Sequence, residues 1–191
     1  MTQGTRFMQV DDQDPNLSTF CQVGGLSRQD QHIMAKVAVY IRPLLPLLTD
    51  RFYEVLAEEP SIRPYIEGRV EHLKKTHVVW LNSLFAGDYG PEFIQRQEKI
   101  GETHVRVRVP PLFVAASMAF LRGALPPVLA ANIPNAQDAI AATASLLRLL
   151  DLCQYLIDRK YAEVLMDNLG ISPALLVRLQ TVGKGTTAKT L

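Results

Sequence analysis

Two histidines and one tyrosine are the residues of this chain whose types and spacing could do chemistry. His77 and His104 lie 27 positions apart, and each falls on the apolar face of its own helical segment, so both imidazoles are expected to point inward. Tyr53 lies in the apolar stripe of an earlier helical segment. Neutral imidazole binds metals, and a buried phenol can donate a hydrogen bond. An inward histidine is still more often a core residue than a ligand, so these three side chains alone leave both interpretations open.

If the histidines do bind a metal, the sequence favours haem over zinc. A zinc site needs three or four nitrogen, sulfur or oxygen ligands at recognisable spacing, and the chain has neither an HExxH motif nor a cysteine cluster. Its two cysteines, Cys21 and Cys153, are far apart in the sequence, which also argues against a disulfide scaffold. A haem needs only one strong axial ligand inside an apolar space walled by helices.

The elements that would position these side chains are all predicted to be helices. Apolar residues recur at helical spacing along nearly the whole chain, while alternating runs bounded by turn signals are missing. Ser27 with Asp30 resembles a capping box that opens a helix. Pro91 and Pro111 suit the first position of two further helices, and Gly170 closes the last long one. The fold class is therefore all-α.

Length and composition bound the organisation and the partners. A chain of 191 residues is long enough for one compact domain. We expect a flexible arm over residues 1–26 that could hold one short helix, a helical domain over residues 27–170, and a tail or the start of a linker over residues 171–191. The net charge of +1 argues against nucleic acid and acidic membranes as partners. Prolines and charged residues interrupt every apolar run and no signal peptide is recognisable, so we expect a cytoplasmic protein without a membrane span.

Two stretches resemble the globin domain of the globin-coupled sensors, a bacterial family of haem-based gas sensors. They are residues 50–56, DRFYEVL, and residues 72–113, which run from HLKKTHVVW to VRVPPLF. The most specific part is IGETHVRVRVPP, because the family has an isoleucine-glycine pair before its proximal histidine and a basic residue and prolines after it. The segment LFAGDYG matches the turn that precedes the proximal helix. Arg108 and Val109 depart from the family, which usually has glycine and leucine there, and the resemblance as a whole covers about residues 28–168.

The resemblance implies that His104 is the proximal ligand of a haem b. It matches Tyr53 to a distal tyrosine, whose phenol would donate a hydrogen bond to bound oxygen, while carbon monoxide would gain much less. Gly101 lies one turn before His104, where it either lets the helix approach the porphyrin or permits close packing on another helix. The second ring nitrogen of His104 is expected to need a hydrogen-bond acceptor.

Further residues match the distal side of the family's site. Leu73 is an expected apolar contact, and Thr76 an expected second polar contact. His77 has two interpretations: it ligates the iron, so that gas must first displace it, or it lines the site as a hydrogen-bond donor. Trp80 and Phe113 are expected in the haem wall or in the core.

The resemblance also implies a fold and a function. The fold is a three-over-three helical globin with an extra N-terminal helix, and the function is sensing of a diatomic gas, with oxygen ahead of carbon monoxide and nitric oxide. We expect a homodimer through the last two long helices and a helix shift that reaches a separate or fused output domain. The domain itself is not expected to be an enzyme. Two alternatives stay open: a haem-free globin-like interaction module, and a haem protein with peroxidase or nitric oxide chemistry.

Overall fold

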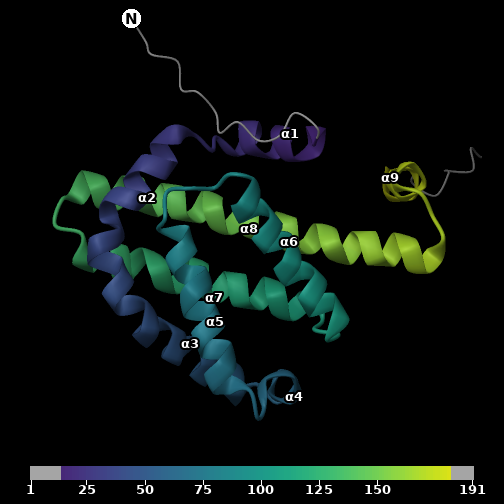
Figure 1. Cartoon of the computed structure of the whole chain (residues 1–191), viewed down its shortest axis with the longest axis horizontal. Helices are drawn as coiled ribbons and strands as arrows, with labels where there is room; N and C mark the ends of the chain where they lie inside the picture. The colour runs from purple at the N-terminus through teal and green to yellow at the C-terminus, as the bar shows by residue number, and fades with distance from the viewer. Residues whose placement is uncertain (1–13, 182–191) are drawn as a thin grey trace, which may run out of the picture.

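The structure is a computed structural model that describes residues 14–181, and all of its regular elements in this range are helices (Figure 1). This confirms the all-α prediction. In chain order the helices are α1 (Pro15–Gly24), α2 (Arg28–Ile41), the short 3-10 helix η1 (Arg42–Leu44), α3 (Leu45–Glu58), α4 (Arg63–Ile66), α5 (Val70–Leu84), α6 (Pro91–Arg106), α7 (Pro111–Asn132), α8 (Ala136–Leu169) and α9 (Pro173–Thr181).

The predicted helix ends appear where the sequence places them. The backbone N–H of Ser27 donates to the carboxylate of Asp30 at 2.8 Å, as expected at the start of α2. Pro91 and Pro111 occupy the first positions of α6 and α7, where their missing N–H groups leave no hydrogen bond unmade. Gly170 closes α8 in the left-handed conformation, with φ 62°.

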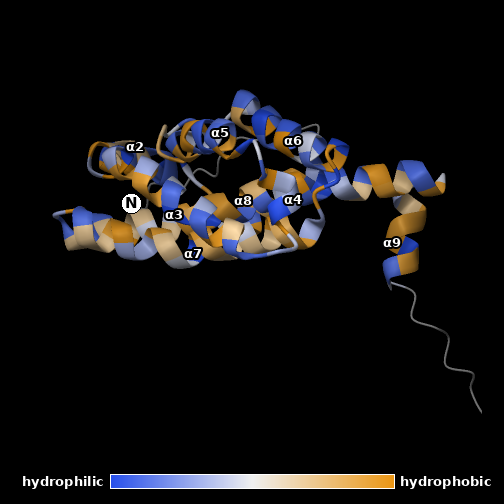
Figure 2. Ribbon diagram, turned by 90° about the horizontal axis from the view of Figure 1, so that it is seen from below, coloured by the Kyte–Doolittle hydropathy of each residue, from blue (hydrophilic) through white to orange (hydrophobic). Residues whose placement is uncertain are grey.

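Helix α8 is the centre of the fold, because α6, α7 and α2 all pack against it. Figure 2 shows α5 and α6 in one layer and α7 in the other. The face that α8 turns to its neighbours includes Leu146, Leu149 and Leu156, each with no exposed surface. The far end of α8 extends beyond the other helices, and α9 lies at that end in both views.

The structure describes part of the N-terminal arm expected over residues 1–26, including a short helix of the kind that the sequence allowed for. Within the described residues, α1 packs onto α8 and buries Leu17 and Cys21. The side chain of Asp14 caps α1 by accepting from the backbone N–H of Leu17 at 3.0 Å. This helix therefore belongs to the folded body, while residues 1–13 lie outside the described part of the chain, as do residues 182–191 of the expected tail.

Helices α7 and α8 are long and apolar enough to cross a membrane, judged by length and composition alone. No such segment was expected from the sequence. Half of the most apolar window of α8 is buried inside the fold, as in the core helix of a globular domain. For α7 the buried share of that window is only 28%. Most residues in this window of α7 are therefore partly buried or exposed.

Candidate haem site

The two candidate histidines lie on helices with different packing partners. His77 is on α5, which packs against α3, whereas His104 is on α6, which packs against α8. One hydrogen bond links the two helices directly: the indole N–H of Trp80 donates to the side-chain oxygen of Gln97 at 2.8 Å. Trp80 lies one turn after His77, and Gln97 lies two turns before His104. The link therefore ties the two histidine-bearing helices side by side.

A second apolar cluster lies next to His77, whose ring contacts its members Phe52 and Tyr53. Its buried members come from α3 and from the segment around α4, and α5 and α7 contribute partly buried side chains. Together they are Phe52, Tyr53, Ile62, Ile66, Leu56, Val70, Leu73, Phe113 and Phe120. The structure thus brings three of the expected site residues, Tyr53, Leu73 and Phe113, into one cluster.

The His77 ring is held on several sides. It stacks on Phe52 at a centroid distance of 4.5 Å and on Trp80 at 5.6 Å. Its Nδ1 lies 3.0 Å from the hydroxyl oxygen of Thr49, and its Nε2 is buried without a hydrogen-bond partner among the described residues. Burial lowers the pKa of His77 to about 4, because a charged imidazolium loses its hydration there. His77 is therefore neutral at physiological pH.

Tyr53 lies beside His77. The edge of one ring faces the other at a centroid distance of 5.8 Å, and only 8% of Tyr53 is exposed. Burial raises the pKa of Tyr53 to about 12, because the phenolate would lose its hydration. The phenol therefore keeps its proton and can donate a hydrogen bond, as the distal assignment requires.

His104 lies in the last turn of α6. Burial lowers its pKa, so the imidazole is neutral and able to ligate a metal. Its Nδ1 is buried and has no hydrogen-bond partner within residues 14–181. The acceptor expected for the second ring nitrogen is thus not found among the described residues.

The backbone around His104 is fixed by a Schellman cap, in which the two residues after the helix bond back to its last turn. The N–H of Val109 donates to the carbonyl of His104 at 2.9 Å, and the N–H of Arg108 donates to that of Val105 at 3.0 Å. Arg108 adopts a left-handed φ of 61°, a conformation that favours glycine. The departure from the family's glycine therefore falls on the residue that closes the proximal helix.

Gly101 lies against α8, which supports the second of the two alternatives that the sequence left open. A Cβ built at Gly101 would lie 2.9 Å from the carbonyl oxygen of Ile157 and 3.0 Å from the side chain of Lys160, both on α8. The missing side chain therefore allows α6 to approach α8, which is the packing alternative.

Thr76 also lies away from the expected distal cluster. Its side chain is exposed, and its hydroxyl donates to the carbonyl of Leu73 on the same helix at 2.9 Å. Thr76 directly precedes His77, so its side chain points about 100° around the helix from that of His77. In this arrangement Thr76 makes no polar contact within the cluster.

Sequence reasoning missed Thr49 and Phe52, which contact His77 directly. Thr49 lies four residues before Tyr53 and therefore on the same helical face, a spacing that could have identified it. Phe52 was visible only as one member of an apolar stripe. Its stacking on His77 depends on how α3 crosses α5, which the spacing of residues along one helix does not reveal.

The side chains present fit a haem. A buried nitrogen without a partner is unusual and costs about 1–3 kcal/mol, and Nε2 of His77 is such a nitrogen among the described residues. Aromatic side chains pack against His77, as beside a porphyrin. Within residues 14–181, no group of three or more His, Cys, Asp or Glu side chains is placed to hold a bare metal ion.

Comparison with known proteins decides the family. The model of the family Protoglobin matches residues 13–166. The chain belongs to the protoglobin family. This confirms the resemblance found in the sequence, because the match includes both stretches on which it depends.

Solved structures support the globin fold of this protoglobin. The globin domain of the Geobacter sulfurreducens globin-coupled sensor is similar with a TM-score of 0.70 at 23% identity, over 75% of this chain and 96% of that one. The globin domain of E. coli DosC in its ferrous form has a TM-score of 0.62 at 21% identity, over 66% of this chain and 88% of that one. The ferric form of the DosC domain has a TM-score of 0.61 at 19% identity, over 78% and 93% of the two chains.

Proposed function

We propose that this protoglobin binds one haem b through His104 and senses a diatomic gas, with oxygen as the first candidate. The observation that carries the proposal is the pair of partly buried, neutral imidazoles on the two helices α5 and α6, with Nε2 of His77 buried and without a partner among the described residues. The family supports it, and so do the printed descriptions of the similar structures as globin domains of a globin-coupled sensor and of DosC.

The haem iron, when bound, supplies the position at which a diatomic gas binds. His104 would hold the haem. Tyr53 keeps its proton and would donate a hydrogen bond to the gas, which would favour oxygen, the more polar ligand, over carbon monoxide. His77, which lies beside Tyr53, would either compete with the gas or donate a hydrogen bond to it.

A route for the signal leads from α6 to α8. Arg159 on α8 pairs with Glu98 on α6 and also with Asp14, which caps α1. The hydroxyl of Tyr161 on α8 donates to the carbonyl of Val109 at 2.8 Å, in the cap that closes the proximal helix. We propose that a shift of α6 on gas binding moves α8 through these contacts.

We propose a homodimer through α7 and α8, because Leu112 on α7 and Ile140 on α8 are 70% and 64% exposed. A separate or fused output domain would then read the change at the dimer interface.

The decisive experiment removes the proximal imidazole. His104→Ala should abolish stable haem binding, measured as loss of the Soret band after reconstitution of the full chain with haem. His32→Ala is the matched control, since His32 is exposed on α2 and should leave the band unchanged. A His104→Ala variant with full haem and an unaltered spectrum would mean that the axial assignment is wrong.

Two other outcomes would replace the proposal. A wild-type chain that takes up no haem would favour a haem-free interaction module. Steady turnover of peroxide or nitric oxide with a reductant would favour an enzyme instead of a sensor.

A further inference from the structure

Thr49 is the residue of this site to which neither the family match nor the sequence assigns a role. It is 1% exposed on α3, and its hydroxyl oxygen makes the one hydrogen bond seen to the His77 ring among the described residues, at 3.0 Å from Nδ1. The other ring nitrogen, Nε2, is buried without a partner. Thr49 therefore decides which nitrogen of His77 is left free.

A neutral imidazole carries one proton, so the contact with Thr49 allows two tautomers. In one, Nδ1–H donates to the threonine oxygen and Nε2 keeps a free lone pair. In the other, the hydroxyl donates to Nδ1, and Nε2 carries a buried N–H without an acceptor. In the first tautomer the hydroxyl proton of Thr49 has no acceptor among the described residues, so each tautomer leaves one buried donor unpaired. Only the first tautomer leaves Nε2 with the lone pair that a metal ligand needs.

We propose that Thr49 is a positioning residue that holds the proton of His77 on Nδ1 and leaves Nε2 as a distal ligand of the haem iron. Histidine ligands of metals generally donate their second N–H to an acceptor, which fixes both the tautomer and the ring orientation. The inference rests on the proposed function, because it assumes that haem binds next to His77. It resolves the open choice between the two roles of His77 in favour of ligation.

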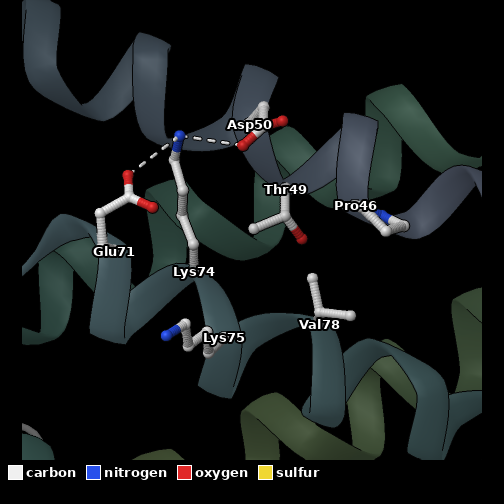
Figure 3. Close-up of a pocket in the computed structure, with 7 residues that line it drawn as sticks. All are labelled: Pro46, Thr49, Asp50, Glu71, Lys74, Lys75 and Val78. Atoms are coloured by element: carbon white, nitrogen blue, oxygen red, sulfur yellow. Dashed lines mark ion pairs between the residues drawn. The ribbon is translucent and has the colours of Figure 1, made fainter.

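A second contact between α3 and α5 lies next to the hydrogen bond between Thr49 and His77 and provides a control. A cleft of about 330 Å³ between the two helices is lined by Thr49, Val78 and charged side chains, and Figure 3 shows Lys74 bridging Asp50 and Glu71 across it. Lys74 lies 2.9 Å from Asp50 and 3.8 Å from Glu71. Asp50 is the residue next to Thr49. A substitution of Asp50 therefore weakens the contact of α3 with α5 and leaves the hydrogen bond between Thr49 and His77 in place.

The test compares three variants of the full chain with the wild type. Thr49→Val has the same shape without the hydroxyl, and Thr49→Ser keeps the hydroxyl. Asp50→Asn removes only the ion pair between Asp50 and Lys74. The first readout is the side-chain ¹⁵N spectrum of the chain without haem, with His77→Ala to assign the signals. We expect a protonated Nδ1 on His77 in the wild type, in Thr49→Ser and in Asp50→Asn, and a loss of this tautomer preference in Thr49→Val.

The second readout is the absorption spectrum of the ferric, haem-loaded chain. Loss of one hydrogen bond should lower the ratio of six- to five-coordinate haem in Thr49→Val by roughly fivefold to tenfold. Thr49→Ser and Asp50→Asn should stay within about twofold of the wild type.

Three results would overturn the inference: a wild-type His77 protonated on Nε2, a Thr49→Val variant with unchanged spectra, or equal changes in Thr49→Val and Asp50→Asn. A wild-type chain that fails to take up haem would contradict the proposed function instead, and the ¹⁵N readout would still decide the role of Thr49.

Discussion

Gly101 offers a sharp test of how α6 and α8 are joined. A Cβ at this position would lie 2.9 Å from the backbone carbonyl oxygen of Ile157, closer than real Cβ contacts. It would also meet Cβ and Cγ of Lys160 at 3.0 Å. The lysine can adjust part of its side chain, but the carbonyl belongs to the hydrogen-bonded backbone of α8. Gly101→Ala should therefore push α6 away from α8.

The size of the effect follows from two opposing terms. Alanine stabilises a helix interior by about 1 kcal/mol relative to glycine. Overpacking of a tight contact costs about 1–3 kcal/mol. Gly123 in α7 has nothing within 4 Å of its Cβ position, so Gly123→Ala should show the helix term alone. The difference between the two variants isolates the clash, and we expect Gly101→Ala to be less stable than Gly123→Ala by about 1–3 kcal/mol.

The assay is urea unfolding of both variants, followed by far-ultraviolet circular dichroism at the same haem saturation, because bound ligand adds to apparent stability. Since His104 lies one turn beyond Gly101, the Soret band of Gly101→Ala should also shift or weaken, while that of Gly123→Ala should not. Equal stability of the two variants would refute the close approach of α6 to α8.

Three further changes test other parts of the structure. Tyr53→Phe should speed the release of oxygen much more than that of carbon monoxide in stopped-flow traces, and equal acceleration would remove Tyr53 from the distal side. Arg108→Gly should raise the free energy of unfolding by up to about 1 kcal/mol, because a left-handed φ strains a residue with a Cβ, and an unfolding midpoint below the wild type would argue against strain. Burial acts to raise the pKa of Asp30, but hydrogen bonds from Ser145 and Ser27 and the charge of Arg148 hold it below its usual 3.8. Asp30→Asn should therefore lower stability by about 2 kcal/mol near neutral pH. This deficit should be full above about pH 4 and vanish as the pH falls through the folded-state pKa, and a deficit that is constant with pH would count against an ionised Asp30.

The sequence alone determined the helices and the inward faces of the candidate ligands. Proline and glycine act locally, so Pro91 and Gly170 mark helix ends whatever surrounds them. The spacing of apolar residues places His77 and His104 on buried faces for the same local reason. The motif around His104 then pointed to the family that the comparison confirmed.

The tertiary structure decided which neighbour each face meets. The sequence predicts that Gly101 permits a close approach, but only the packing of α6 on α8 shows that Ile157 and Lys160 are its neighbours. Thr49 and His77 are 28 positions apart, and only the crossing of α3 and α5 joins them. Helical periodicity is a property of one segment, whereas such contacts depend on the relative placement of segments distant in the chain.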